Sequence, residues 1–467
     1  MIKTKLSWIA QQTNGRLEGQ DCDVSNISTD TRTLQHGDIY LALVGDNYNG
    51  HAFVQNAKNA GAIAVIASER INTDLPVVYV KDTKLALGEL GAAVKREVNP
   101  KTIAITGSSG KTTVKEMTAA ILSRRGNVLA TQGNFNNDIG VPLTLLRLEP
   151  HHDFAVMELG ANHLGEIAYT TNLVKPDVAT IVNAAASHLE GFGSLLGVAR
   201  AKSEIFKGLD EHGVAILNVD SQFANFWKGK LRYNNVLTFS PDQQNEADFT
   251  AQEITIGLNG CAEFELLCPQ GQVSIQLNIP GIHNVGNALV AAALALQVGA
   301  TLDDVRDGLL NMAQVKGRLN VKMLTSQVRL LDDTYNANVA SVSAAIDTLA
   351  SFSGKRVLIL GDMAELGEKA RFYHEQVGQY ALDKGIDTII TLGVLSQCAS
   401  AVFGPNGYHF SDIDSLIDNL ENTLSFEQRD ISILVKGSRS SRMERVVTAI
   451  EESPVGKLDR RRERIAC

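Results

Sequence analysis

The chain has 467 residues, 44% of them hydrophobic and 20% charged, and a net charge of −9. This composition is typical of a globular protein of about three domains. It argues against nucleic acid as the main partner, because no excess of Lys and Arg is present to neutralise phosphates. The five cysteines form no Cys-X-X-Cys pair, which indicates reduced thiols in a cytoplasmic protein. No signal-peptide pattern is evident, and the longest apolar run, 288–296, is too short to cross a bilayer, so no membrane insertion is expected.

Residues 1–99 form the first of three blocks, in which short apolar runs alternate with helical patterns. Strands are expected at 39–43, 63–66 and 77–80, because short runs rich in Ile, Val and Leu are typical of buried strands. The block ends in the charged segment 95–100, which we interpret as a linker. A small α/β domain is therefore expected here.

The second block, 100–314, opens with the most informative motif of the chain. An apolar run at 102–105 leads directly into Gly107-Ser-Ser-Gly-Lys-Thr-Thr113 and then into a helical pattern. Glycines let the backbone approach a phosphate, and the free amides at a helix start face that anion. Lys111 is placed to reach the β- and γ-phosphates, and the Thr112 hydroxyl to bind Mg²⁺. The spacing is shorter than that of the general phosphate-loop motif, so an ordinary strand–helix turn is the alternative.

Strands and helices continue to alternate through this block. Strands are expected at 154–157, 178–182 and 214–217, which favours a parallel sheet with helices on both faces. Between about 235 and 280 the pattern changes to short alternating stretches, which predict an antiparallel addition. An alanine-rich helix is expected at 287–298.

The third block repeats the alternation, with strands expected at 356–361, 387–392 and 431–436. These strands predict a second doubly wound sheet, but no Gly-X-Gly-X-X-Gly pattern follows them, so dinucleotide binding has no support. The predicted fold is α/β in three domains: a small α/β domain at 1–99, a central P-loop ATPase-like parallel sheet with an antiparallel addition at 100–314, and a C-terminal Rossmann-like domain at 315–467.

Three further side chains could take part in chemistry. Glu158 ends the strand that begins at Phe154, at the sheet edge where ligands bind in open α/β folds. Together with Thr112 it could hold one Mg²⁺ through oxygen atoms, the alternative being a surface glutamate. His188 follows the next strand and Lys202 lies on a helical pattern. Taken alone, His188 is typical of a histidine with a structural role. Lys202 is typical of a lysine on the solvent-exposed face of a helix.

Over essentially its full length the sequence resembles the Mur ligases, the ATP-dependent amide-forming enzymes of peptidoglycan synthesis. The strings that carry the resemblance run from Gly133 to Leu146, Met157 to Ala161, Ser187 to Ser194, Asp332 to Asn338 and Leu360 to Gly367. The first and fourth of them are typical of members that join D-alanyl-D-alanine to UDP-N-acetylmuramoyl-tripeptide. The segment from Ser28 to Arg32 is shared with members that add the third peptide residue. One departure is Val339, where the family usually has a proline, and it predicts a less rigid loop.

The resemblance implies roles for individual residues. It implies catalytic roles for Lys111, Glu158, His188, Lys202 and Arg318. It implies nucleotide contacts from Gly107, Ser108, Ser109, Gly110, Lys111, Thr112, Thr113, Asn284, Asn287, Arg318 and Asp333. Substrate contacts are implied for Asp30, Arg32, Asn134, Asn137, Tyr335 and Asn336. Two Mg²⁺ ions would be held by Thr112, Glu158, His188 and Lys202, the last resembling a lysine that family members carbamylate. Residues 436–439 would meet the peptide or the incoming dipeptide.

The implied reaction joins the tripeptide carboxylate to the amine of D-Ala-D-Ala through an acyl phosphate. We expect a cytoplasmic monomer acting on small molecules, in a pathway that serves the cell wall, cell shape and cell division. Two alternatives stay open: another ligase of the superfamily, such as a third-residue Mur ligase or folylpolyglutamate synthase, and an ATPase that joins nothing. The segment from Ser28 to Arg32 argues against the folate enzyme, and dependence of ATP turnover on an amine acceptor would exclude the ATPase.

Overall fold

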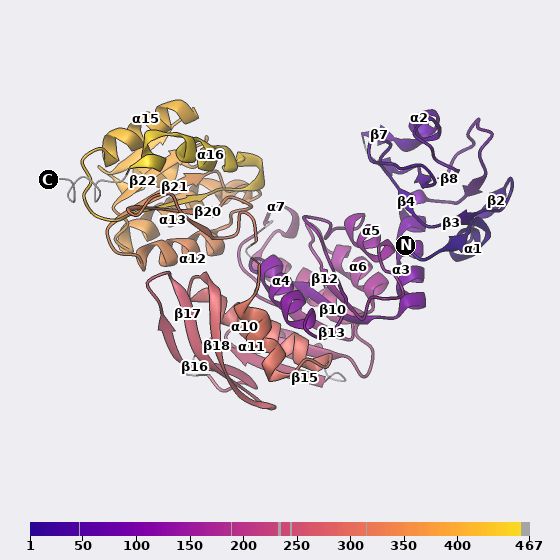
Figure 1. Cartoon of the computed structure of the whole chain (residues 1–467), viewed down its shortest axis with the longest axis horizontal. Helices are drawn as coiled ribbons and strands as arrows, with labels where there is room; N and C mark the ends of the chain where they lie inside the picture. Colours follow the sequence, from indigo (N-terminus) through magenta and orange to yellow (C-terminus); the bar gives the residue numbers. More distant parts are fainter. Residues whose placement is uncertain (46, 188, 232–234, 243–244, 314, 459–467) are drawn as a thin grey trace.

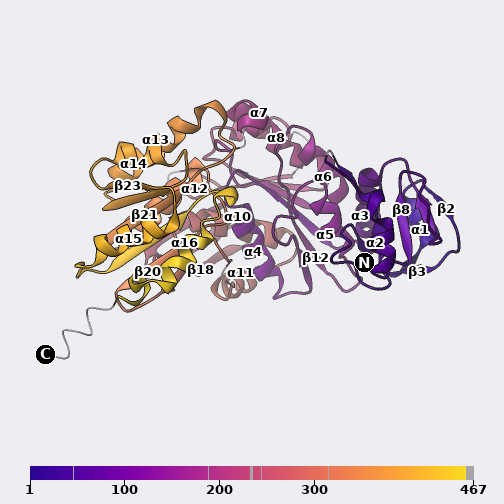
Figure 2. The same cartoon turned by 90° about the horizontal axis from the view of Figure 1, so that it is seen from above.

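The computed structural model describes residues 1–458 except 46, 188, 232–234, 243–244 and 314. Its elements form three groups in a row, with the first at one end, the last at the other and the largest sheet between them (Figures 1 and 2). The predicted α/β architecture in three parts is confirmed. No helix in the described part of the chain has the length and apolar character needed to span a membrane.

The N-terminal group is built around a five-stranded sheet. Its strand order is β2–β9–β8–β5–β4, parallel except for the β2–β9 pair. The strands are β2 (Arg16–Glu18), β4 (Ile27–Ser28), β5 (Ile39–Leu41), β8 (Ala64–Ala67) and β9 (Val77–Tyr79), with two small pairs, β1 (Thr4–Lys5) with β3 (Asp23–Val24) and β6 (Val44–Gly45) with β7 (Tyr48–Asn49). The helices are α1 (Leu6–Gln12), η1 (Gly50–Phe53), α2 (Val54–Asn59) and α3 (Thr83–Val98).

Helix α3 connects this group to the next. Its start is fixed by Asp82, whose carboxylate accepts the amides of Lys84 and Leu85 at 2.8 and 2.9 Å. The helix packs along α5 (Gly140–Leu146) and α6 (Glu166–Val174) of the central group. A Cβ at Gly91 would lie 3.0 Å from Pro142 in α5, so this close approach requires a glycine. The expected linker at 95–100 is wrong, because residues 95–98 are the last turn of α3.

The central sheet has nine strands in the order β11–β12–β10–β13–β14–β15–β16–β17–β18. Their bounds are β10 (Lys101–Thr106), β11 (Val128–Ala130), β12 (Phe154–Glu158), β13 (Val178–Ile181), β14 (Val214–Asn218), β15 (Asn235–Ser240), β16 (Phe249–Ile256), β17 (Cys261–Cys268) and β18 (Gly271–Pro280). The predicted antiparallel addition is confirmed for β16–β17–β18. It begins later than expected, since β15 still runs parallel to both of its neighbours.

Helices cover both faces of this sheet, as predicted. Alternate residues of β10 serve opposite faces: Ile103 and Ile105 belong to one hydrophobic cluster and Ala104 to the other. On the Ile103 side lie α4 (Lys111–Leu122), α10 (His283–Gln297) and α11 (Leu302–Leu310). The remaining helices of this group are α7 (Leu189–Phe192), α8 (Leu195–Ser203), η2 (Glu204–Gly208) and α9 (Ala224–Lys228).

The C-terminal group has a six-stranded sheet in the order β19–β20–β24–β21–β22–β23, parallel except for β19. The strands are β19 (Asn320–Met323), β20 (Val328–Asp333), β21 (Lys355–Gly361), β22 (Thr388–Leu392), β23 (Gly407–Phe410) and β24 (Ile431–Lys436). The helices are α12 (Val339–Ala350), η3 (Gly367–Lys369), α13 (Ala370–Asp383), α14 (Gln397–Phe403), α15 (Ile413–Leu424), η4 (Arg439–Ser441), α16 (Glu444–Glu452) and η5 (Pro454–Lys457). Figure 1 shows α12 and α13 on one face of the sheet and α15 and α16 on the other.

Candidate functional site

The predicted phosphate loop joins β10 to α4. Gly110 precedes the helix with a φ of 78°, and no side chain caps the helix start. A Cβ at this position would lie 2.8 Å from the Asn287 side chain, so only glycine fits without a shift. The amides at the start of α4 are thus available to an anion, as the motif predicts.

Asn183, just after β13, holds the first half of this loop. Its Oδ1 accepts the amides of Ser108 and Ser109 at 3.1 and 3.0 Å, and its Nδ2 donates to the carbonyl and hydroxyl oxygens of Ser109. The Ser108 hydroxyl also exchanges hydrogen bonds with the backbone of Ala185. No role was predicted for Asn183, although its place just after a parallel strand is a signal of a ligand-binding residue.

Lys111, Thr112 and Glu158 come together as predicted. The Thr112 hydroxyl donates to Glu158 Oε2 at 3.0 Å, and Lys111 Nζ donates to the Gly107 carbonyl at 2.8 Å. Burial lowers the pKa of the Lys111 ammonium, an effect that Glu158 opposes and Arg318 reinforces. The carboxylate of Glu158 is 2% exposed, so it is a buried charge in contact with the loop.

The asparagine-rich segment contributes one residue to the site that was not predicted. Asn136 donates to Glu158 Oε1 at 2.9 Å and so fixes the carboxylate. Asn137 accepts the amide of Gly140, the first residue of α5, at 2.8 Å, and Asn134 is exposed. The sequence could not separate these three neighbours, because only the turn geometry decides which side chain contacts Glu158.

Lys202 lies in α8 and is 3% exposed. Burial, together with the nearby Lys111, lowers the pKa of its amine well below the usual range. His188 lies outside the described residues. Within the described residues no three His, Cys, Asp or Glu side chains form a cluster able to hold a metal ion.

Residues of the C-terminal group reach the phosphate loop at two points. Arg318 Nη2 donates to the Thr112 hydroxyl at 3.3 Å, and the Arg318 guanidinium lies 4.3 Å from the centre of the Tyr335 ring. Asn338 Nδ2 donates to the Ser108 carbonyl at 3.0 Å. The same Asn338 caps α12 through its contact with Ser341, which holds the end of the loop despite Val339 in place of the usual proline. Of these two residues, only Arg318 was predicted from the sequence.

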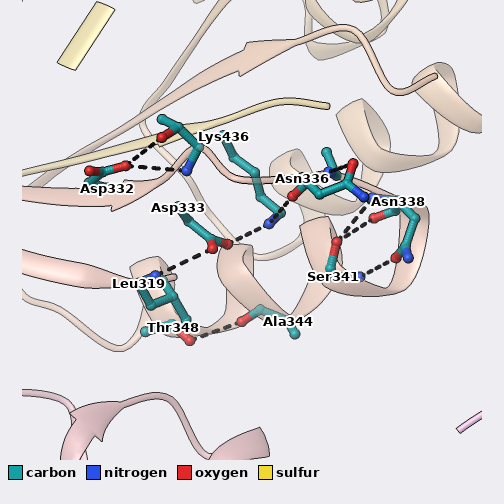
Figure 3. Close-up of polar contacts among 11 residues, drawn as sticks. Leu319, Asp332, Asp333, Asn336, Asn338, Ser341, Ala344, Thr348 and Lys436 are labelled. Carbon is teal, nitrogen blue, oxygen red and sulfur yellow. Dashed lines mark hydrogen bonds and ion pairs between the residues drawn. The ribbon is translucent and has the colours of Figure 1, made fainter. Parts of the chain in front are cut away.

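A cavity of about 160 Å³ lies between these groups. Its wall includes the predicted nucleotide contacts Ser109, Gly110, Thr113, Asn284, Asn287, Arg318 and Asp333, and further residues such as His283, Ser341 and Lys436. The two asparagines are joined, because Asn287 Nδ2 donates to Asn284 Oδ1 at 2.8 Å. Figure 3 shows Lys436 pointing at Asp333 and at the Asn336 carbonyl. Lys436 therefore lies in this cavity wall, whereas Ser438 bonds the Asp362 carbonyl.

Asp30 and Arg32 lie in the N-terminal group, after β4. The Arg32 amide and guanidinium both donate to the Asp30 carboxylate, at distances of 2.6 to 3.1 Å. These hydrogen bonds lower the pKa of Asp30 to about 2. The pair thus presents a fixed, charged turn at the surface, at the opposite end of the central group from the cavity.

Three family models match the chain. The model for the Mur ligase family, catalytic domain, covers residues 23–122, the Mur ligase middle domain covers 105–295, and the Mur ligase, glutamate ligase domain covers 317–439. A relative from Escherichia coli, UDP-N-acetylmuramoyl-tripeptide–D-alanyl-D-alanine ligase, is 50% identical over 97% of this chain and 99% of its own length.

Two solved structures share the fold. The crystal structure of MurF from Acinetobacter baumannii has a TM-score of 0.92 at 36% identity and covers 97% of this chain and 100% of its own. MurF ligase from Thermotoga maritima in complex with ADP has a TM-score of 0.82 at 26% identity and covers 92% of this chain and 97% of its own. With relatives this similar along nearly all of its length, the chain belongs to the Mur ligase family.

Proposed function

We propose that this chain uses ATP to join D-alanyl-D-alanine to UDP-N-acetylmuramoyl-tripeptide in peptidoglycan precursor synthesis. The observation that carries the proposal is the 50% identity, over 97% of the chain, to an enzyme named for that reaction. The site geometry supports it, because Thr112 is contacted both by Glu158 from its own group and by Arg318 from the C-terminal group. Such a site can neutralise and orient phosphates between two parts of the chain.

In this proposal the cavity holds the nucleoside and the loop holds the phosphates of ATP. Asn284 and Asn287 face the base, Asp333 accepts a ribose hydroxyl, and the amides at the start of α4 contact the phosphates together with Lys111 and Arg318. The ADP complex of the Thermotoga maritima protein supports nucleotide binding in this family.

The donor set fits magnesium. Thr112 and Glu158 offer the oxygen atoms that Mg²⁺ prefers, and their hydroxyl and carboxylate are within 3.0 Å of each other. His188 and a carbamate on Lys202 would complete two ion sites. Carbamylation requires an uncharged amine, and the low pKa that burial gives Lys202 favours that form. Bound magnesium would neutralise charge on the transferring phosphoryl group.

The reaction then needs no covalent intermediate on the enzyme. The tripeptide carboxylate attacks the γ-phosphorus, the bond to the β-phosphate oxygen breaks, and ADP leaves. The amine of D-Ala-D-Ala attacks the resulting acyl phosphate, loses a proton to solvent, and expels inorganic phosphate as the C–N bond forms. Lys111 and Arg318 act by placing positive charge beside the phosphates throughout.

The substrate side of the proposal uses the remaining predicted residues. Asp30 and Arg32 bind the UDP-sugar end, and Asn134, Asn137, Tyr335 and Asn336 contact the peptide. We propose domains at 1–99, 100–314 and 315–467, and a cytoplasmic monomer.

The decisive experiment measures phosphate release with ATP, Mg²⁺ and UDP-N-acetylmuramoyl-tripeptide, with and without D-Ala-D-Ala, while mass spectrometry follows the UDP-pentapeptide. Release that requires the dipeptide and matches the product is expected. Lys111→Ala is the control: it should abolish turnover and leave the circular dichroism spectrum unchanged. Release that is indifferent to the dipeptide, without pentapeptide, would favour the ATPase alternative, and substantial activity in Lys111→Ala would overturn the phosphate-loop assignment.

A further inference from the structure

Lys436 is the last residue of β24, and its side chain is almost completely buried. The parallel pairing of β20 with β24 places it opposite Asp333, the last residue of β20. Its Nζ donates to Asp333 Oδ2 and, at 3.0 Å, to the Asn336 carbonyl (Figure 3). Only 1% of the Lys436 side chain is exposed. One ammonium therefore holds both a carboxylate and the backbone of the loop that follows β20.

A buried ion pair of this kind is a costly way to stabilise a fold. Removing two charges from water costs several kcal/mol per ion, and apolar side chains of similar size often do as well. Both partners line the cavity that the proposed function assigns to the nucleotide. Because of this position, the ion pair can take part in ligand binding as well as in stabilising the fold.

The orientation of Asp333 depends on this contact. Its Oδ1 accepts the Leu319 amide at a long 3.3 Å, whereas its Oδ2 is bound by the Lys436 ammonium. A charge-assisted hydrogen bond is the stronger of the two, so Lys436 is the main restraint on the carboxylate. Without it, Asp333 would lose both its partner charge and its fixed direction.

The second bond of Lys436 acts on the loop that reaches the phosphate loop. Asn336, whose carbonyl it binds, lies two residues before Asn338. Asn338 caps α12 and donates to the Ser108 carbonyl at 3.0 Å, across the boundary between the two groups of elements. Figure 3 shows Asn336, Asn338 and Ser341 side by side in this turn.

We propose that Lys436 is a positioning residue of the nucleotide site, which orients Asp333 toward the ribose and fixes the 334–338 loop against the phosphate loop. The proposal rests on the nucleotide site of the proposed function. It assigns Lys436 to nucleotide binding, where the family resemblance had suggested contact with the peptide or dipeptide.

The test compares ADP with 2′,3′-dideoxy-ADP, because only ADP offers the hydroxyls that Asp333 would accept. Isothermal titration calorimetry on the full chain should show that the parent prefers ADP by about tenfold, the effect of one hydrogen bond to a charged group. Lys436→Met should bind ADP about tenfold more weakly and lose this preference. In turnover it should raise KM for ATP and leave KM for D-Ala-D-Ala unchanged.

The matched control is Lys322→Met. Lys322 lies on β19, beside β20, and pairs with Glu451 at 2.6 Å, where it is 42% exposed. It should bind both nucleotides like the parent. If Lys436→Met does not fold, Lys436→Gln, which removes the charge but keeps a donor, is measured against the same criterion.

The outcomes separate this inference from the proposed function. A preference for ADP that persists undiminished in the folded variant overturns the role of Lys436, as does a change in KM for the dipeptide alone. Failure of the parent to bind ADP would instead remove the nucleotide site itself, and with it the proposed function.

Discussion

At the scale of single residues, Asn183 makes four hydrogen bonds to the phosphate loop from one carboxamide. We expect Asn183→Ala to weaken ADP binding by about tenfold, because the amides of Ser108 and Ser109 lose their acceptor and the loop loses its shape. Binding of AMP should change much less, since the loop faces the outer phosphates. Equilibrium binding of the two nucleotides measures both effects.

The matched control for this prediction is Asn127→Ala. Asn127 is another asparagine of the central group, whose side chain donates a single surface hydrogen bond to the His151 carbonyl at 3.0 Å. Its replacement should leave both affinities unchanged. An equal loss of AMP and ADP affinity in Asn183→Ala would show that the residue supports the fold rather than the loop.

Lys202 allows a chemical test. Lys202→Ala should lose at least about a hundredfold in turnover, because the proposed carbamate, which would help to hold the magnesium that neutralises phosphate charge, is lost. Acetate or propionate should partly restore the rate by supplying a carboxylate in the space left by the side chain. Lys207→Ala, which removes an exposed lysine in η2, five residues further on, should keep the parent rate with or without acetate. Full activity of unrescued Lys202→Ala would remove this residue from the mechanism.

The sequence predicted part of this site because some of its features are local. Lys111 and Thr112 follow from the loop motif, and Glu158 from its place at the end of a strand. Asn136, Asn183 and Asn338 were missed, since their roles depend on contacts between segments far apart in the chain. The contact of Lys436 with Asp333 was not expected, because nothing in the sequence reveals that β24 lies beside β20.

At the scale of elements, the start of α13 is tied to the loop after β21 by a buried histidine. His374 Nε2 accepts the Met363 amide at 2.9 Å, while its Nδ1 lies 2.7 Å from the Ala370 carbonyl. Burial lowers the pKa of this imidazole. An imidazolium could not accept the Met363 amide, so the folded protein requires the neutral ring.

This gives a pH dependence of definite sign. The unfolded chain binds the proton of this histidine near pH 6.5 and the folded chain only at lower pH, so the contribution of His374 to stability is fully present above about pH 6.5 and is lost as the pH falls below it. The slope for one proton is at most about 1.4 kcal/mol per pH unit. Urea unfolding at pH 7.5, 6.5 and 5.5 should show the loss, and His374→Gln should reduce it. His212→Gln, at an exposed histidine, should leave the slope unchanged; a parent-like slope in His374→Gln would contradict the assignment.

Helices and strands were predicted correctly from the sequence where apolar runs are long. They were not predicted where a buried segment contains charged residues. The strands β21, β22 and β24 were expected within one or two residues, because each is a buried run in a parallel sheet. By contrast, the charged sequence of the last turn of α3 predicts a linker, which is wrong. Lys95 there is buried along its stem, and its ammonium donates to the Lys175 carbonyl at 3.1 Å. Strand β20 was not expected either, since it ends in two aspartates.

At the scale of the whole molecule, the hydrophobic clusters join two of the three groups of elements and leave the third with clusters of its own. One cluster contains residues from Leu6 through Leu231 and so joins the N-terminal and central groups across α3. The C-terminal group has two clusters of its own, on the two faces of its sheet. We therefore expect two unfolding transitions in calorimetry, one for the C-terminal group and one for the other two together.

A substitution in α3 tests this division. Gly91→Val should lower the transition of the joined N-terminal and central groups by several degrees, because the new side chain would meet Pro142 of α5. The C-terminal transition should keep its temperature. Gly229→Val, at an exposed glycine with more room, is the control and should shift neither by much. A separate third transition for the N-terminal group would contradict the shared core.

The hydrophobic cluster that joins the N-terminal and central groups sets the distance between them. If Asp30 and Arg32 hold the UDP-sugar end of the substrate, as proposed, their separation from Glu158 depends on the packing of α3, because one hydrophobic cluster joins the two regions across this helix. The distance between these two regions then determines which length of substrate fits. A substrate one residue shorter, held at its sugar end, would leave its carboxylate short of the phosphate loop. The packing of α3, the helix that contains Gly91, would thus determine which peptide length the enzyme accepts, although this helix is remote from both ends of the substrate.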